Sequence, residues 1–296
     1  MSKCSICPRN CNADRINGEK GVCGVCGEGI YVSRAALHMW EEPCISGRSG
    51  SGTIFFSGCN LKCVYCQNNS ISRGICGKEV SVDRLSDICM ELEKKGANNI
   101  NLVTPTHYAL HIRDTIVKAR EKGLKIPIVY NSSGYESCKT LNMLNGLIDI
   151  FLVDFKYIRE ETARRYSKAK DYPKAAKDAI SCMVKQTGSC RFNNEGLMRK
   201  GVIVRHLLLP GHVAEGKEII KYLYDTYGNN IYVSIMNQYT PVSGMDEYPE
   251  INRKVTKREY DRLVNYAIEL GIQNAYIQEG DTAAESFIPS FDCEGV

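Results

Sequence analysis

The sequence lacks any apolar run long enough to cross a membrane. Apolar stretches such as 201–204 and 207–209 are far short of the roughly 18 residues that a membrane span needs. It also lacks a basic start followed by an apolar stretch, so we expect no secretion signal and a cytoplasmic protein. Charge of one sign is not in excess, since 38 Lys and Arg stand against 34 Asp and Glu, a net charge of +4. We therefore expect no membrane partner, and nucleic acid is not an expected partner either.

Cysteine is unusually frequent for a chain of this kind. There are 15 cysteines in 296 residues, about 5%, which is below the roughly 8–10% of a disulfide scaffold. An odd count without an export signal also disfavours a disulfide framework, so clustered cysteines are better read as metal or iron–sulfur ligands. Two clusters occur, one formed by Cys4, Cys7, Cys11, Cys23 and Cys26 and the other by Cys59, Cys63 and Cys66.

The order of short apolar runs predicts the fold. From Thr53 onward, β-branched or aromatic runs alternate with helical patterns, as in βα units around a parallel sheet. We expect an α/β fold with two parts, a Cys-rich metal-binding extension over residues 1–50 and a partial (β/α)6 TIM-like barrel over 51–296. Six repeats are too few to close an eight-stranded barrel. The expected strands span 53–57, 100–104, 126–130, 150–154, 202–206 and 231–235, with a further short strand at 275–278.

Two helices have clear signals in the sequence. Leu85, Ile88, Cys89 and Leu92 fall on one helical face. The segment 256–259 reads Thr-Lys-Arg-Glu, a capping box that predicts the start of the last helix.

Three cysteines follow the first expected strand in the pattern Cys59-x3-Cys63-x2-Cys66. Four-iron clusters usually take four cysteine ligands. Three in a compact loop, with no fourth close by, leave one iron open for a ligand that is not protein, and a vacant metal position is typical of catalytic sites. A zinc knuckle with a remote fourth ligand is the alternative interpretation.

At these residues the sequence resembles the radical S-adenosylmethionine (SAM) superfamily. The superfamily pattern Cys-x3-Cys-x-aromatic-Cys is matched by Cys59, Cys63, Tyr65 and Cys66. The resemblance implies a 4Fe–4S cluster whose open iron binds SAM, and an oxidoreductase that cleaves SAM to a 5′-deoxyadenosyl radical for hydrogen abstraction. It also implies a reductant such as flavodoxin or ferredoxin.

A closer resemblance is to the pyruvate formate-lyase activating enzymes and a group related to them. It rests on 149–156 and 204–211, and, for the related group, on 7–11, 40–44 and 104–108. It implies that a glycyl radical is formed on a partner protein, a glycyl radical enzyme. Two alternatives remain open. One is radical modification of a small molecule, a peptide or RNA, for which the basic stretch at 156–200 is the sequence support. The other is a non-catalytic iron–sulfur protein that serves electron transfer.

Polar residues follow the expected strands, at the ends where parallel α/β barrels gather their functional residues. The carboxylate of SAM needs a cation, for which Lys156 and Arg205 are the candidates. Its ribose hydroxyls need the acceptors and amides that Asn131 and Ser133 offer. Together these residues predict a cofactor lying across the strand ends.

Further site residues follow from the resemblance. Tyr65 is expected near the adenine, and Asp154 matches an aspartate near a cation site beside the sulfonium. The activating enzymes have a Gly-Gly-Glu-Pro segment that receives the SAM amino group. This chain has Val-Thr-Pro-Thr at 103–106, so backbone carbonyls around Thr104 are expected to serve. His107 and His206 also lie at strand ends and, with Asp154, are the candidate catalytic residues.

The amino-terminal cysteines have the spacing Cys4-x2-Cys7-x3-Cys11-x11-Cys23, with Cys26 as a spare. Four thiolates close a zinc site or complete a second iron–sulfur cluster, and the spacing does not decide between them. A structural metal is the preferred interpretation, because this segment has little other core. A segment without any metal is the third alternative.

Overall fold

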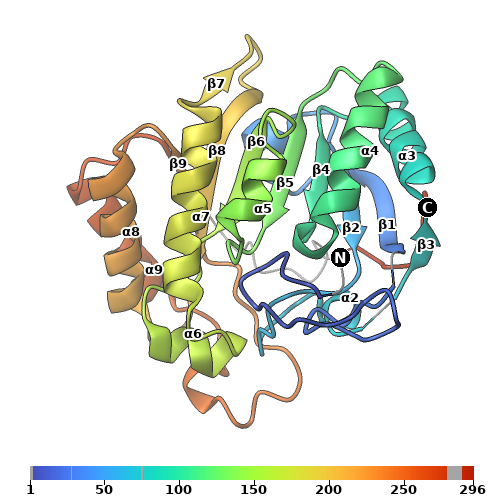
Figure 1. Ribbon diagram of the computed structural model, residues 1–296. Coiled ribbons are helices and arrows are strands. Elements are labelled where there is room, and N and C mark those ends of the chain that lie inside the picture. Colours follow the sequence, from blue (N-terminus) through green and yellow to red (C-terminus); the bar gives the residue numbers. More distant parts are fainter. Residues whose placement is uncertain (1–2, 28, 75, 279–288) are drawn as a thin grey trace.

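An open, mostly parallel β-sheet runs through the molecule, and helices cover one of its faces (Figure 1). The structure is a computed structural model that describes residues 3–27, 29–74, 76–278 and 289–296. Within these ranges, no helix combines the length and the apolar character that crossing a membrane requires.

The sheet has the strand order β10-β9-β8-β6-β5-β4-β2-β1-β3. The strands from β2 to β10 along this order pair in parallel. Strands β1 and β3 add an antiparallel edge, and β7 pairs antiparallel with β8 outside the main order. The bounds are β1 Ile30–His38, β2 Ser51–Phe56, β3 Lys78–Val80, β4 Ile100–Val103, β5 Ile128–Ser132, β6 Ile150–Asp154, β7 Arg191–Phe192, β8 Met198–Leu207, β9 Tyr232–Met236 and β10 Ala275–Ile277.

Helices connect the successive parallel strands. Figure 1 shows α4, α5, α7 and α8 side by side in front of the sheet, while the amino-terminal segment (dark blue) crosses its lower end. The bounds are α1 Pro43–Ser46, α2 Asn69–Ser72, α3 Val82–Lys94, α4 Ala109–Glu121, α5 Cys138–Met143, α6 Glu160–Ser167, α7 Tyr172–Thr187, α8 Val213–Tyr227 and α9 Lys257–Glu269, with short 3-10 turns at Thr106–Tyr108 and Pro249–Ile251.

The sequence patterns explain why these elements form. In β6, Ile150 to Val153 are all fully buried, as expected of a strand covered on both faces. Helix α3 begins where the Ser81 side chain accepts a hydrogen bond from the Arg84 amide. Helix α9 begins at the predicted capping box, in which Thr256 and Glu259 satisfy each other's backbone amides.

The predicted α/β fold with a partial barrel is confirmed, and each of the expected strands is present. The strand expected at 126–130 begins at Ile128, directly after Pro127, which has no amide to donate to a ladder. The sequence analysis missed β1. Residues 30–38, which it assigned to the extension, pair with β2 in the main sheet.

The first part of the extension, residues 3–27, has no helix or strand. It is held against the barrel by two arginines. Arg9 donates to the carbonyl oxygens of Asn60 at 2.8 Å and Ser167 at 3.2 Å, and Arg15 donates to the His107 carbonyl at 3.0 Å. The segment is therefore anchored beside the loop that carries Cys59, Cys63 and Cys66.

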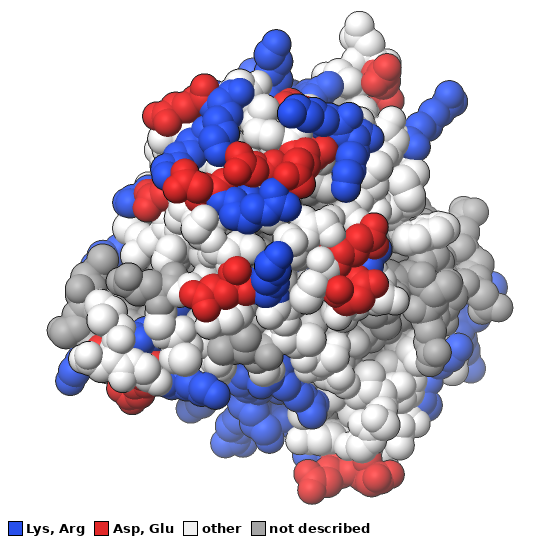
Figure 2. All heavy atoms as spheres, turned by 90° about the vertical axis from the view of Figure 1, so that its right-hand side faces the viewer, with Lys and Arg blue, Asp and Glu red and all other residues white. Residues whose placement is uncertain are grey.

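One face of the molecule carries interleaved charges. Figure 2 shows acidic and basic side chains mixed over its upper part. Ion pairs between α3 and α4 account for such mixing, with Asp83 Oδ1 2.6 Å from Lys118 Nζ and Asp87 Oδ1 2.7 Å from Lys122 Nζ. The upper part of this face therefore has no field of a single sign.

Candidate active site

A cavity of about 330 Å³ opens on the inner face of the sheet, towards the carboxyl ends of the parallel strands. Its walls include Phe55, Val103, Asn131, Arg205 and Met236, each from a different strand. Parallel strands bring their carboxyl ends to one edge, so residues far apart in the sequence meet there. This edge also carries the cysteine loop that follows β2.

The cysteine loop is fixed by backbone hydrogen bonds on both of its sides. The Cys59 amide donates to the Cys23 carbonyl at 3.1 Å, and the Val64 amide donates to the Tyr166 carbonyl at 2.8 Å. The loop is thus held between the amino-terminal segment and the end of α6. A loop tethered in this way presents its cysteines without help from a regular element.

Each sulfur of the loop accepts a hydrogen bond, which stabilises the thiolate form that binds metal. Among the described residues, no three His, Cys, Asp or Glu side chains converge closely enough to share one metal ion. An iron–sulfur cluster does not require such convergence, because each cysteine of a cluster binds a different iron. The hydrogen bonds run from the Leu61 amide to Cys59 at 3.4 Å, from Ser167 Oγ to Cys63 at 3.0 Å and from Ser72 Oγ to Cys66 at 3.4 Å.

Without a metal, the three thiols oppose one another's ionisation. Burial, and then the proximity of Cys63 and Cys66, raises the pKa of Cys59 to about 12. Burial also raises the pKa of Cys63, although Lys156 acts in the opposite direction. A cationic cluster among these sulfurs reverses both effects, because coordinated thiols are deprotonated.

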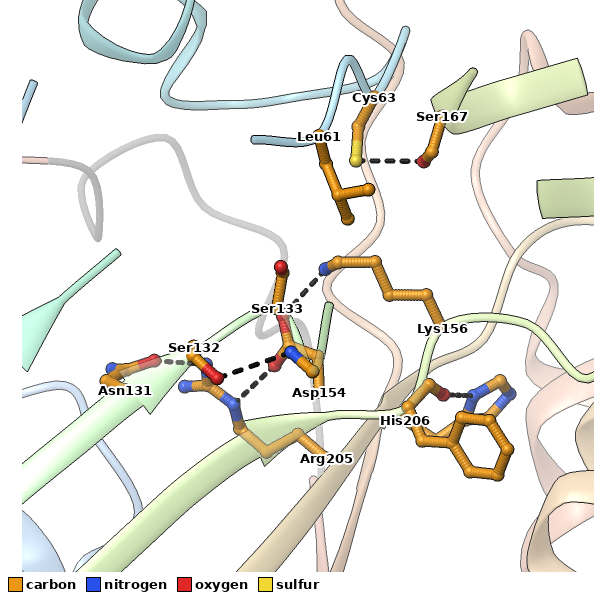
Figure 3. Close-up of polar contacts among 12 residues, drawn as sticks. Leu61, Cys63, Asn131, Ser132, Ser133, Asp154, Lys156, Ser167, Arg205 and His206 are labelled. Carbon is orange, nitrogen blue, oxygen red and sulfur yellow. Dashed lines mark hydrogen bonds and ion pairs between the residues drawn. The ribbon is translucent and has the colours of Figure 1, made fainter. Parts of the chain in front are cut away.

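A cluster of charged side chains lies next to the cysteine loop. Asp154 accepts from Lys156 Nζ at 2.6 Å and from Arg205 Nε at 2.9 Å, and Arg205 Nη2 donates to Asn131 Oδ1 at 2.7 Å (Figure 3). Figure 3 shows the Lys156 ammonium between Asp154 and Cys63. The predicted residues Asn131, Asp154, Lys156 and Arg205 are thus brought together by β5, β6 and β8.

The electrostatics of this cluster favour its ionised form. Burial acts to raise the pKa of Asp154, but Arg205 and Lys156 more than offset it, so the pKa of Asp154 is lowered. Burial acts to lower the pKa of Lys156, but the Asp154 carboxylate and Cys63 more than offset it, so the pKa of Lys156 is raised. The carboxylate and the ammonium therefore stay charged at neutral pH.

The sequence analysis missed two acidic residues of this site. Glu41 accepts from Asn101 Nδ2 at 2.9 Å and from Arg205 Nη1 at 3.2 Å, and Glu42 lies beside it in the wall of the cavity. Burial raises the pKa of both carboxyls, although Arg205 acts against it. Glu42 Oε2 is buried and makes no hydrogen bond with the described residues. Residues 40–44, Trp-Glu-Glu-Pro-Cys, support the family resemblance, and the two adjacent acidic residues within them are the sequence signal for this part of the site.

Tyr65, Ser133 and Thr104 are the remaining residues predicted to contact the cofactor. The Tyr65 ring is buried, and its hydroxyl lies 2.5 Å from the Tyr157 hydroxyl. The Ser133 hydroxyl is buried and makes no hydrogen bond with the described residues. Thr104 has a φ of 60°, and its amide donates to the Asn131 carbonyl at 2.9 Å. A β-branched residue in this left-handed region is strained, and such strain is often found at functional sites.

Both candidate catalytic histidines are buried and bonded to backbone. His107 Nε2 lies 2.7 Å from the Ser57 carbonyl oxygen, and burial lowers the pKa of His107 to about 4. His206 Nδ1 lies 2.9 Å from the Phe155 carbonyl oxygen, and Figure 3 shows its ring turned away from Asp154. Neither histidine is part of the cavity wall. Of the three candidates, Asp154 is the one that lies among the charged groups.

Comparison with known proteins places this geometry in context. Residues 53–223 match the family model of the radical SAM superfamily. The uncharacterized protein MJ0674 of Methanocaldococcus jannaschii is 31% identical over 284 residues, which cover 93% of this chain and 77% of that protein.

Similarity to solved structures is at the level of the fold. SuiB of Streptococcus suis has a TM-score of 0.51 and 14% identity, covering 77% of this chain and 48% of SuiB. SuiB bound to its precursor peptide SuiA has a TM-score of 0.50 and 15% identity, covering 75% of this chain and 46% of SuiB. The chain thus spans about half the length of these solved proteins.

Proposed function

Because this chain belongs to the radical SAM superfamily, we propose that it abstracts a hydrogen atom from a polypeptide, with a glycine of a glycyl radical enzyme as the target. The family implies a 4Fe–4S cluster and SAM as cofactors. When bound, these cofactors supply a 5′-deoxyadenosyl radical that abstracts the hydrogen atom. We expect the electron for this reaction from a flavodoxin or a ferredoxin.

The cysteine loop fits the cluster. Cys59, Cys63 and Cys66 provide three thiolates, each with a hydrogen-bond donor, on a loop fixed at both sides. Hydrogen bonds to the sulfurs of a cluster are among the features that set its reduction potential. The loop follows β2 directly and Lys156 lies next to Cys63, so a cluster held by this loop would adjoin the charged groups of the barrel.

The single observation that carries the proposed SAM site is its charge balance. Lys156 and Arg205 face three carboxyls, those of Asp154, Glu41 and Glu42. Burial raises the pKa of Glu41 and Glu42, and a bound cation would favour their ionised forms, in which the five groups have one net negative charge. SAM has a sulfonium, an ammonium and a carboxylate, hence one net positive charge. Opposite charges attract strongly in a site that excludes water.

The chain's own residues have distinct tasks in this proposal. Lys156 binds the SAM carboxylate, since its ammonium lies between Asp154 and Cys63. The unbonded Ser133 hydroxyl and Glu42 Oε2 offer buried acceptors that a cofactor would satisfy. Arg205 is a positioning residue, because three of its N–H groups already bind side chains of the protein.

The substrate is proposed from the surface around the cavity and from resemblance. Trp40 and Ile277 contribute to the cavity wall, yet 62% and 41% of their surfaces are exposed. Large exposed apolar side chains beside a cavity are typical of sites that receive another chain. The resemblance to activating enzymes and the peptide-bound state of SuiB support a polypeptide.

A fractionated extract tests the substrate class. An anaerobic cell extract would be separated by ultrafiltration into macromolecules and small molecules. Each fraction would then be added separately to the reconstituted, reduced protein with SAM. We expect the macromolecular fraction to stimulate 5′-deoxyadenosine formation and to acquire a glycyl radical signal in electron paramagnetic resonance. Stimulation by the small-molecule fraction alone would contradict a polypeptide substrate.

A further inference from the structure

The amino-terminal segment keeps its shape with little apolar core. In residues 3–27, Ala13 and Val25 are buried, but Ile16 and Val22 are 57% and 39% exposed. The segment has no helix or strand that would satisfy its backbone in a regular way. A segment of this kind needs a covalent or metal crosslink to be stable.

Four cysteines of the segment gather around Gly21 and Cys23. A Cβ added to Gly21 would lie 3.3 Å from the sulfurs of both Cys11 and Cys23, so the glycine packs between them. The Cys23 thiol is also close enough to Cys4 and Cys7 for electrostatic interaction. These four cysteines are therefore neighbours in space.

The fifth cysteine of the segment is Cys26, the spare in the spacing. Cys26 interacts electrostatically with Tyr31 on β1. It therefore serves as a matched control for experiments on the other four.

The arrangement of the four sulfurs distinguishes a cluster from a single ion. Four thiolates on one zinc ion have sulfurs about 3.8 Å apart, because each Zn–S bond is about 2.3 Å long. Among the described residues no three side chains of the metal-binding types come together in that way. The same holds for Cys59, Cys63 and Cys66, whose cluster the family implies. Neither group is therefore arranged for a single ion, and the cysteines of an iron–sulfur cluster do not need that arrangement because each binds a different iron.

Two of the sulfurs also receive donors that suit a cluster. Cys7 accepts from the Arg9 amide and from the Asn60 side chain, and Cys23 accepts from the Val25 amide. Both cysteines are buried, with 7% of their surfaces exposed. Buried thiolates with hydrogen-bond donors match the setting of iron–sulfur ligands.

We propose that Cys4, Cys7, Cys11 and Cys23 bind a second iron–sulfur cluster, packed directly against the loop of the first. The carbonyl oxygen of Cys23 accepts the Cys59 amide at 3.1 Å, so one hydrogen bond joins the two ligand segments. Gly58, with a φ of 86°, allows this approach, since a Cβ there would lie 2.8 Å from the same carbonyl oxygen. The site goes beyond the proposed function and does not depend on the identity of the substrate.

Metal content tests the proposal without measuring activity. The full chain would be reconstituted anaerobically with iron and sulfide, and iron, sulfide and zinc would be counted. We expect about eight irons per chain and no stoichiometric zinc. About four irons with one zinc would overturn the proposal, and so would about four irons with no zinc.

Variants assign the iron to the two sites. The variant C59A/C63A/C66A should keep about four irons. The variant C4A/C11A should also keep about four irons, and the electron paramagnetic resonance signal of that cluster should change when SAM is added. The control C26A should keep all of the iron. Loss of all iron in C59A/C63A/C66A, with the circular dichroism of the folded chain, would contradict the second cluster. If C4A/C11A does not fold, the iron content of the wild-type chain alone tests the proposal.

Discussion

Arg205 offers the sharpest test of how the charged groups of the site depend on one another. Its Nε donates to Asp154 at 2.9 Å, its Nη1 to Glu41 at 3.2 Å and its Nη2 to Asn131 at 2.7 Å. These acceptors come from three different parts of the chain. A lysine at this position keeps the charge but has a single ammonium group, which cannot reach three acceptors in the plane of a guanidinium.

The expected loss of stability follows from these contacts. Arg205→Lys removes about two hydrogen bonds to buried side chains. Each such bond contributes about 1.5–3 kcal/mol to stability when one of its groups is charged. Because the charge is retained and water can enter, we expect the free energy of unfolding to fall by about 3 kcal/mol. Arg205→Met should cost more, since it leaves two buried carboxylates without this partner.

Urea unfolding under anaerobic conditions measures this loss, and SAM binding measured by calorimetry should weaken in parallel. Arg159→Lys is the matched control. Arg159 pairs with Glu218, and about half of each side chain is exposed, so its replacement should have little effect. If Arg205→Lys is as stable as the wild type and binds SAM equally well, the proposed role of Arg205 is wrong.

Three further predictions concern neighbouring groups. Thr104→Gly should relieve the strain of its positive φ and raise the free energy of unfolding by about 1 kcal/mol, measured in urea, whereas a loss would show that the threonine is not strained. The pKa of His107 is lowered to about 4 from an unfolded value near 6.5, so stability should fall as the pH drops from 7.5 to 5.5. His107→Gln should reduce that fall by about 1 kcal/mol, and an unchanged profile would contradict the burial of a neutral imidazole. Ser167→Ala removes the hydrogen bond to Cys63 and should lower the reduction potential of the cluster by about 20–60 mV in a redox titration, while an unchanged potential would show that this bond is unimportant.

The parallel strands were predictable because each is a short β-branched run of its own. The run at 150–154 is an example, and its observed bounds match the expected ones. Strand β1 was not predictable in the same way. Its pairing with β2 depends on contacts across the chain, and the glycines and cysteines before it concealed a strand that begins at Ile30.

The residues of the site also differ in whether the sequence alone predicts them. Lys156, Asp154 and Arg205 follow or end strands, so the rule that parallel strands gather functional residues at one edge was sufficient to find them. Glu41 and Glu42 lie before β2, on a segment that crosses the inner face of the sheet, and only the three-dimensional arrangement brings them to Arg205. The same rule also selected His107 and His206, but both side chains are buried and neither lines the cavity.

The central claim is that this chain cleaves SAM at a cluster held by Cys59, Cys63 and Cys66. The most direct measurement is the formation of 5′-deoxyadenosine by the reconstituted, reduced protein, compared with Cys63→Ala and with Cys26→Ala as the control. We predict that the wild type and Cys26→Ala form 5′-deoxyadenosine and that Cys63→Ala forms none. Equal formation by Cys63→Ala would contradict the cluster assignment. A wild type with a filled cluster that does not bind SAM would contradict the account of the site.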